Sequence, residues 1–409
     1  MKKISAVILL CSMFLLLIYP YHADASIKNT IHKKEGEAVT VAAQADAQLN
    51  IDSPSAVLIE GSTGKIIFEK NKDERRKPAS ITKIMTLLLI FEALDSGQIS
   101  LTDEVTVSEY AASMGGSQVY LEPNETQNVD TMLKCISIAS ANDASVAMAE
   151  LVAGSEEEFV ARMNNRAKEL GMNNTNFVNC CGLDTDNHYS SAYDIALMSR
   201  ELIMKHPDIS KYSTVWMDTI THKTRRGESE FGLSNTNKLV KFYQGITGLK
   251  TGSTSLAKYC LSATAKRNNM DLIAVIVGAP DTKLRFSEAS KLLNYGFANY
   301  SVYIDDNKDT ILNPVKVSKG VVDTVNGQTE KDFSYLCAKG KSVQEIKKEL
   351  TLYETIEAPV AKGAKIGEIT YYYGKDKIGS IDILATEDIE KAGLKDYFIK
   401  SLKKYFMGN

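Results

Sequence analysis

The chain has 409 residues, of which 44% are hydrophobic and 24% charged, and its formal net charge is −3 at pH 7. This length allows two or three domains with a large apolar core, and the composition is ordinary for a globular protein. The nearly balanced charge gives no sign of a nucleic-acid partner.

The first 25 residues have the features of an export signal. Two lysines precede an apolar run of 15 residues, 4–18, which is short for a membrane span. The triplet Ala23-Asp24-Ala25 matches a signal-peptidase site, so we expect a signal peptide over residues 1–25. An uncleaved N-terminal anchor is the alternative. The polar residues 26–50 predict a flexible arm.

Residues 51–302 carry the pattern of an α/β (α+β) domain. Strands open and close this segment and helices fill its middle, which predicts an antiparallel sheet with a helical cluster. The expected strands are 56–59, 65–68, 248–252, 259–266 and 272–278, and the expected helices are 81–94, two runs within 128–153, 155–170, 192–204 and 283–298.

Residues 303–387 change to short alternating strands, separated by turns such as Asn326-Gly327. This pattern predicts a small β-sandwich domain, and we find no chemical motif in it. The expected strands are 315–317, 332–336, 351–354, 365–373 and 377–385.

The last segment, residues 388–409, is helical in pattern from Lys391 to Phe406. The apolar face contains Leu394, Phe398, Leu402 and Tyr405, and the opposite face contains Lys400, Lys403 and Lys404. A basic amphipathic helix with aromatic side chains predicts an anchor at a membrane surface. A helix docked on the β-rich domain is the alternative.

The cysteines do not form a recognisable framework. Five follow the predicted signal peptide, and this odd number argues against a set of disulfides. Cys180 and Cys181 are adjacent, and adjacent cysteines rarely form a disulfide because the resulting ring is strained. Since none belongs to a C-x-x-C motif, we expect no metal and no cofactor, and most of these cysteines are expected to be small buried hydrophobes.

Three short motifs occur in order along the predicted catalytic domain. They are Ser80-Ile81-Thr82-Lys83, Ser140-Ala141-Asn142 and Lys250-Thr251-Gly252. Each motif is weak alone, but the ordered S-x-x-K, S-x-N and K-T-G set is typical of enzymes that acylate a serine without a histidine. No G-x-S-x-G and no H-E-x-x-H motif is present, so neither an α/β-hydrolase triad nor a zinc peptidase is supported.

The chemistry explains why a serine and a lysine stand three residues apart. A serine hydroxyl is a poor nucleophile until a nearby base takes its proton. We expect Ser80 to be the N-cap of the helix 81–94, with Lys83 one turn along on the same face. A lysine near other cations and partly removed from water loses affinity for its proton, so Lys83 can act as the base.

The chain resembles the low-molecular-weight penicillin-binding proteins of the D-alanyl-D-alanine carboxypeptidase type over roughly residues 51–385. The resemblance implies a β-lactamase/transpeptidase-like catalytic domain followed by a β-rich domain. It rests on the stretches 78–86, Ser140-Ala141-Asn142-Asp143-Ala144, Gly182-Leu183-Asp184, His188-Tyr189-Ser190-Ser191-Ala192-Tyr193-Asp194 and Gly248-Leu249-Lys250-Thr251-Gly252.

The resemblance also implies roles for the motif residues. Ser80 would be the acylated nucleophile and Lys83 its proton acceptor, while Ser140 would relay a proton to the leaving amine. Asn142 would hold the substrate's amide and orient Lys83. Lys250 would also be catalytic, lying across the cleft and keeping the local potential positive. The substrate-binding residues would be Lys250, Thr251, Gly252 and Arg285, with the terminal carboxylate on Thr251 and Arg285, and the oxyanion hole would consist of the backbone N–H groups of Ser80 and Ser253.

The implied reaction removes the terminal D-alanine from peptidoglycan stem pentapeptides, with β-lactam antibiotics as covalent inhibitors. The implied location is the outer face of the cytoplasmic membrane. A β-lactamase and a DD-endopeptidase using the same site remain alternatives, although we find no glutamate equivalent to the one that a class A β-lactamase uses for deacylation. The third alternative is a peptidoglycan-binding protein without activity. His188 is expected at the cleft rim or in a structural hydrogen bond.

Overall fold

The computed structural model describes residues 49–407 apart from residues 226, 308–309 and 311. The predicted signal peptide and nearly all of the predicted flexible arm therefore lie outside the described residues. Within the described part, no helix combines the length and the apolar character that a membrane crossing requires.

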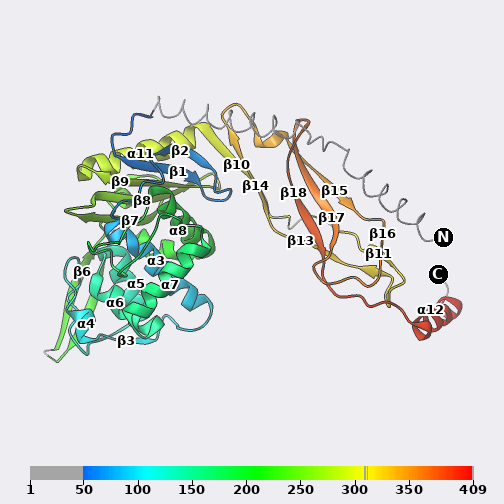
Figure 1. Ribbon diagram of the computed structural model, residues 1–409, viewed down its shortest axis with the longest axis horizontal. Coiled ribbons are helices and arrows are strands. Elements are labelled where there is room, and N and C mark those ends of the chain that lie inside the picture. Colours follow the sequence, from blue (N-terminus) through cyan, green and yellow to red (C-terminus); the bar gives the residue numbers. More distant parts are fainter. Residues whose placement is uncertain (1–48, 226, 308–309, 311, 408–409) are drawn as a thin grey trace, which may run out of the picture. The chain divides into compact units, whose positions relative to one another are not determined.

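The centre of the first domain is a five-stranded antiparallel sheet in the order β2-β1-β9-β8-β7 (Figure 1). Strand β1 pairs with both β2 and β9, so strands from the two ends of the domain meet in one sheet, as the sequence pattern predicts. The strands are β1 (Ser55–Glu60), β2 (Ile66–Lys70), β7 (Ile246–Thr254), β8 (Lys258–Arg267) and β9 (Met270–Ala279).

Helices cover both faces of this sheet, which explains why β1 and β9 contain continuous apolar runs, residues 56–59 and 272–277. In β1, Val57 and Ile59 belong to the core shared with the helical cluster. Leu58 points to the other face, where Gly296 of α11 (Thr282–Asn299) approaches it closely. Successive side chains of a strand point to opposite faces, so burial of both faces requires a continuous apolar run.

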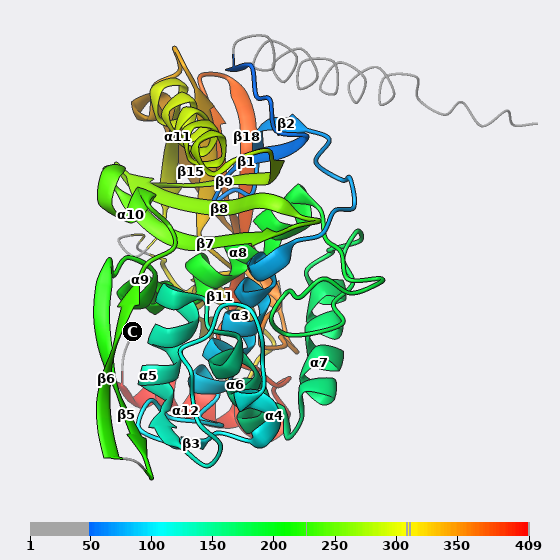
Figure 2. The same ribbon diagram turned by 90° about the vertical axis from the view of Figure 1, so that its left-hand side faces the viewer.

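The helical cluster packs against the face of the sheet that bears α8 (Figure 2). Its helices are α3 (Lys83–Asp95), α4 (Glu109–Ala112), α5 (Val129–Lys134), η2 (Cys135–Ala139), α6 (Asn142–Ala153), α7 (Glu156–Glu169) and α8 (Ala192–Lys205), followed by the short η3 (Pro207–Ile209), α9 (Ser210–Ser213) and α10 (Leu239–Phe242). Two antiparallel strand pairs that the sequence analysis did not predict complete it: β3 (Glu104–Thr106) with β4 (Thr126–Asn128), and the hairpin β5 (Met217–Thr224) with β6 (Gly227–Ser234).

The start of α3 corrects one expectation. Ser80 is not a helix N-cap, because it lies inside a 3₁₀ turn, η1 (Ala79–Thr82), and makes no capping hydrogen bond. The α-helix begins only at Lys83, after Thr82. The serine and the lysine nevertheless remain one turn apart, since a 3₁₀ turn places residues i and i+3 on the same side.

The C-terminal residues form short strands around a separate apolar core. One sheet has the order β12-β11-β16, a second has the order β13-β18-β17-β15, and β10 pairs with β14. This confirms a small β domain. Its elements are β10 (Tyr300–Asp305), β11 (Val315–Ser318), β12 (Thr324–Val325), β13 (Gly327–Thr329), β14 (Phe333–Ala338), η4 (Val343–Glu345), β15 (Ile346–Leu352), β16 (Thr355–Glu357), β17 (Lys365–Tyr373) and β18 (Asp376–Ala385).

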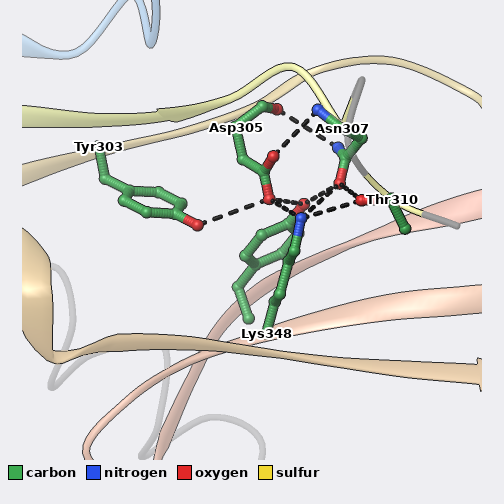
Figure 3. A network of polar contacts seen from close by, with 6 residues as sticks. Tyr303, Asp305, Asn307, Thr310 and Lys348 are labelled. Atoms are coloured by element: carbon green, nitrogen blue, oxygen red, sulfur yellow. Dashed lines mark hydrogen bonds and ion pairs between the residues drawn. The ribbon is translucent and has the colours of Figure 1, made fainter.

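A polar network joins residues of the β domain that follow β10 to strands β15 and β17 (Figure 3). Lys348 Nζ of β15 lies 2.7 Å from Asp305 Oδ2 and also donates to Thr310 Oγ1. The Tyr371 hydroxyl donates to Asn307 Oδ1 at 3.1 Å. The ring of Tyr371 stacks on another aromatic ring of the core. The network therefore satisfies the polar groups next to an apolar stack, and its role is structural.

The last helix is α12 (Leu394–Met407), as the amphipathic pattern predicts. Several of its large apolar side chains are exposed, with Leu394 92% and Tyr405 83% accessible. Lys400 instead donates to the carbonyl of Gly320 and pairs with Asp323 of the β domain. The helix thus contacts the β domain through a lysine while much of its apolar surface stays open.

Candidate active site

The turn that carries Ser80 has an unusual backbone. Ala79 adopts a positive φ of 49°, which is uncommon for a residue with a side chain. Gly182 lies against this turn, and a Cβ at Gly182 would be 1.8 Å from the carbonyl oxygen of Ala79. The glycine of the Gly-Leu-Asp stretch is therefore required by the close approach of two backbones, and it fixes the position of Ser80.

Lys83 is completely buried and has three oxygen atoms around its ammonium group. Its Nζ donates to Ser80 Oγ at 3.1 Å, to Asn142 Oδ1 at 2.6 Å and to the Cys181 carbonyl at 2.8 Å. Burial lowers the pKa of Lys83 from the ordinary lysine value, because desolvation penalises the charged form. The site thus joins a nucleophile to a lysine that gives up its proton more readily than usual.

The second motif brings Ser140 to the lysine of the third motif. Ser140 follows the π-helical turn η2 and has a φ of 64°, which turns the chain before α6 begins. Lys250 Nζ donates to Ser140 Oγ at 2.8 Å and to the Thr251 carbonyl at 3.1 Å. Burial and the nearby charges of Lys83 and Arg285 hold the pKa of Lys250 well below its usual range.

Asn142 is held in place by a loop that the motif search did not identify. Its amide Nδ2 donates to the Gly115 carbonyl at 2.6 Å, which leaves Oδ1 to face Lys83. The neighbouring Asp143 accepts hydrogen bonds from the N–H groups of Val119 and Leu121. This buried carboxylate therefore fastens the loop whose carbonyl orients Asn142. Its place directly after the S-x-N motif is the signal that could have identified it.

Strand β7 forms the edge of the sheet and passes over the serine turn (Figure 2). A Cβ at Gly252 would lie 3.0 Å from the backbone nitrogen of Ser80, so only glycine allows this approach. Thr251 Oγ1 donates to Thr236 Oγ1 at 2.7 Å. Thr236 belongs to no motif, and nothing in the residues around it indicates its role. The exposed Ser253 follows in the same strand.

Arg285 lies in α11 and reaches the third motif from the buried side of β7. Its Nη1 donates to the carbonyls of Gly252 and Cys260, both at 3.2 Å. Desolvation lowers the pKa of Arg285 to about 10. The guanidinium therefore holds two neighbouring strands together and adds positive charge behind Lys250.

His188 has a structural position. One ring nitrogen lies 2.8 Å from Thr82 Oγ1, and the other accepts the backbone N–H of Val178. Burial lowers the pKa of His188 to about 4, so the ring is neutral at physiological pH. His188 thus braces the serine turn from behind, and the structural alternative of the sequence analysis is the one that fits.

The motif residues thus converge in one place, because Lys83 contacts Ser80 and Asn142 while Lys250 contacts Ser140. Such an arrangement can transfer an acyl group to Ser80 and hold an anionic substrate group nearby. Lys250 in the site and Arg285 behind it are the basic groups available to such an anion.

Comparison with known proteins agrees with this chemistry. Residues 40–281 match a family described as D-alanyl-D-alanine carboxypeptidase, and residues 306–391 match the C-terminal domain of penicillin-binding protein 5. The chain is 46% identical to the D-alanyl-D-alanine carboxypeptidase DacF of Bacillus subtilis (strain 168), over 88% of this chain and 90% of that relative. It is 33% identical to DacC of Escherichia coli (strain K12), over 84% of this chain and 86% of that relative.

Solved structures show the same fold. Penicillin-binding protein 5 from Haemophilus influenzae superimposes with a TM-score of 0.70 and 32% identity, over 84% of this chain and 98% of that structure. Penicillin-binding protein 6B from Escherichia coli superimposes with a TM-score of 0.64 and 30% identity, over 81% and 95%. The similarity therefore extends over both the catalytic residues and the C-terminal β domain.

Proposed function

The chain belongs to the D-alanyl-D-alanine carboxypeptidase family of low-molecular-weight penicillin-binding proteins, and from this membership we propose how its residues carry out the reaction. It is a serine-type carboxypeptidase acting on peptides that end in D-alanyl-D-alanine. The observation that carries the proposal is the 3.1 Å contact between Lys83 Nζ and Ser80 Oγ, because it joins the nucleophile to a base.

The first step is acylation of Ser80. Neutral Lys83 accepts the hydroxyl proton while Oγ attacks the carbonyl carbon of the penultimate D-alanine. The carbonyl oxygen becomes negative, and the backbone N–H groups of Ser80 and Ser253 stabilise it. The close passage of Gly252 over the Ser80 nitrogen supports this assignment, since it places the two N–H-bearing segments side by side.

The leaving D-alanine needs a proton on its nitrogen and a partner for its carboxylate. Ser140 relays to this nitrogen the proton that Lys83 took from Ser80, so that Lys83 is neutral again, and the contact of Ser140 with Lys250 at 2.8 Å holds the Ser140 hydroxyl in place. Thr251 holds the carboxylate by its hydroxyl, with Lys250 and Arg285 providing positive charge. Water then attacks the acyl-enzyme carbonyl and releases the shortened peptide with the Ser80 proton restored.

Covalent capture of penicillin tests the nucleophile. The intact mass of the protein should increase by one penicillin in the native chain and stay unchanged in Ser80→Ala, because the acyl group has no other acceptor. Ser113→Ala, which removes an exposed hydroxyl from a loop of the same domain, should be labelled like the native chain. An adduct that persists in Ser80→Ala would refute the assignment of Ser80 as the nucleophile.

The enzyme acts on the cell wall, outside the cytoplasm. We propose that residues 1–25 direct export, that the catalytic domain spans about residues 51–302 and the β domain residues 303–387, and that α12 holds the enzyme at the outer face of the cytoplasmic membrane. The exposed apolar side chains of α12 support the last point, since water disfavours them and a lipid interface accepts them.

A further inference from the structure

A cluster of two thiols and a carboxylate lies behind the catalytic lysine. Cys180 and Cys181 are both buried, and their Sγ atoms are 3.6 Å apart. Glu156, the first residue of α7, joins them, so that one ligand atom from each residue lies within 4.8 Å of the other two. The mechanism above uses only the backbone carbonyl of Cys181, and the three side chains have no part in it.

The spacing of the two sulfur atoms fits a metal ion. Zinc binds cysteine thiolates at about 2.3 Å in tetrahedral geometry, which places two such sulfurs about 3.8 Å apart. Thiolates combined with a carboxylate form a donor set that suits zinc, and three protein ligands leave one position for water. We propose that Cys180, Cys181 and Glu156 bind one Zn²⁺ ion per chain.

The sequence analysis expected no metal because the cysteine spacing lacks a C-x-x-C motif. That reasoning considered cysteines alone, whereas the fold supplies the third ligand from a residue 24 positions earlier. The adjacent cysteines also share one rigid loop, since the Asn179 side chain accepts the N–H groups of Cys181, Gly182 and Leu183. The loop therefore holds the two sulfurs together before any ion arrives.

The carboxylate is oriented by partners of its own, as in other metal centres. Glu156 Oε1 accepts the backbone N–H of Cys180 at 2.9 Å, and Oε2 accepts the Tyr110 hydroxyl at 2.6 Å. Tyr110 is 51% exposed and Glu156 is partly exposed, so the carboxylate end of the cluster lies near the surface while the two thiols are buried. Tyr110 is thus the outer partner whose loss should weaken binding without removing a ligand.

Metal uptake by the full-length protein tests the proposal directly. The protein is purified under reducing conditions, incubated with ZnCl₂ alone, and analysed by mass spectrometry of bound metal and by calorimetry. We expect one Zn²⁺ per chain. Titration with Cd²⁺ should produce a sulfur-to-metal charge-transfer band in the ultraviolet, which reports thiolate ligands in the native chain without any substitution.

Variants then identify the ligands. Cys180→Ser and Cys181→Ser should each weaken Zn²⁺ binding by more than about 100-fold, and Tyr110→Phe by about 10–100-fold, the range for loss of an outer partner. Cys337→Ser is the matched control, because it removes a buried thiol of the β domain and should bind like the native chain. Circular dichroism and thermal unfolding confirm that each variant is folded.

Three outcomes would overturn the proposal. The first is the absence of a Cd²⁺ charge-transfer band in the reduced native protein. The second is stoichiometric Zn²⁺ binding that survives both cysteine substitutions. The third is a Cys180–Cys181 disulfide in the enzyme as isolated from cells, seen as a mass lower by two hydrogen atoms, because the thiols would then not be available to a metal.

Discussion

Lys83 occupies an environment that favours its neutral form. It has no exposed surface, and the groups around its Nζ are a hydroxyl, an amide oxygen and a backbone carbonyl. None of these groups carries the negative charge that would stabilise an ammonium ion strongly. The lowered pKa of Lys83 is therefore a consequence of burial, and it makes the lysine suitable as a general base.

The pH dependence of acylation should report this lysine. Only the neutral amine accepts the Ser80 proton, so the rate of penicillin acylation should rise with pH and level off below 10.5, the ordinary lysine pKa, because burial lowers the pKa of Lys83. Lys83→Arg should lower the rate by at least about 100-fold and remove the rise, because arginine stays charged. Lys168→Arg on the exposed face of α7 serves as the control. Near-normal acylation by Lys83→Arg would mean that Lys83 supplies only positive charge.

Carboxylate recognition should depend on the Thr251 hydroxyl. A hydrogen bond to a charged group contributes about 1.5–3 kcal/mol, so Thr251→Val should reduce kcat/KM for a free-acid D-Ala-D-Ala peptide by about 10- to 100-fold. Thr247→Val, a change of the same type in the same strand, should have little effect. Steady-state kinetics with free-acid and C-terminally amidated peptides provide the measurement. Equal cleavage of both peptides by the native enzyme would exclude carboxylate recognition at this site.

The motifs were sufficient to predict which residues meet, since their types and order reflect one reaction. They could not predict the residues that hold them. Asp143, Thr236 and the Cys181 carbonyl act through contacts between segments that are distant in sequence. Every residue has a backbone carbonyl, so the residue type does not reveal which carbonyl binds a catalytic group. Aspartate and threonine residues are too common to indicate a role by themselves.

At the scale of the elements, the active site depends on backbones that approach each other without side chains between them. The 3₁₀ turn η1 is enclosed by the loop of Gly182 and by strand β7 at Gly252. Both glycines face the backbone of residues 78–81. The position of Ser80 therefore depends on the packing of the turn η1 between the Gly182 loop and strand β7.

Substitution of Gly182 should reveal this dependence. Gly182 has a φ of +85° and a clashing neighbour, whereas Gly171 has a φ of +73° and open space around it. Gly171→Ala should cost about 1–2 kcal/mol of stability for its left-handed backbone and leave acylation unchanged. Gly182→Ala should cost more and slow acylation at least about tenfold, because the turn must move. Urea unfolding and penicillin labelling measure the two effects, and equal behaviour of the variants would contradict the packing argument.

Prediction of the elements succeeded where one face is apolar and failed elsewhere. The strands of the central sheet and the long helices were anticipated from their apolar patterns. The hairpin β5–β6 was missed because few of its side chains are buried. In the β domain, β15 begins at Ile346, whereas the predicted strand began at residue 351. The prediction missed the first residues because Lys347, Lys348 and Glu349 are all exposed and show no alternation of polar and apolar side chains.

At the scale of the whole molecule, the chain combines a buried catalytic centre with an exposed apolar helix at the end of its described part. Attachment to a membrane surface, as proposed above, would raise the local concentration of the enzyme near any substrate at that surface. The lysine contact between α12 and the β domain does not cover the aromatic residues Phe398, Tyr405 and Phe406. These side chains are therefore available to lipid.

Removal of α12 should release the enzyme from membranes without affecting catalysis. The cut belongs after Gly393, because residues 389–392 still pair with the β domain. The full chain should sediment with anionic vesicles and be partly released by high salt, since each lysine near the surface contributes about 1 kcal/mol that salt screens while the apolar contribution persists. The shortened chain should remain in solution and keep its carboxypeptidase activity.

Point variants test whether vesicle binding depends on the apolar face of α12 or on exposed apolar side chains anywhere in the protein. Phe398→Glu combined with Tyr405→Glu should abolish sedimentation of the full chain, because both charges would have to enter the lipid interface. Phe242→Glu, which changes an aromatic residue of the catalytic domain that is 73% exposed, should sediment normally. If the shortened chain binds vesicles as well as the full chain does, another part of the protein is the anchor, and α12 is then a structural helix of the β domain.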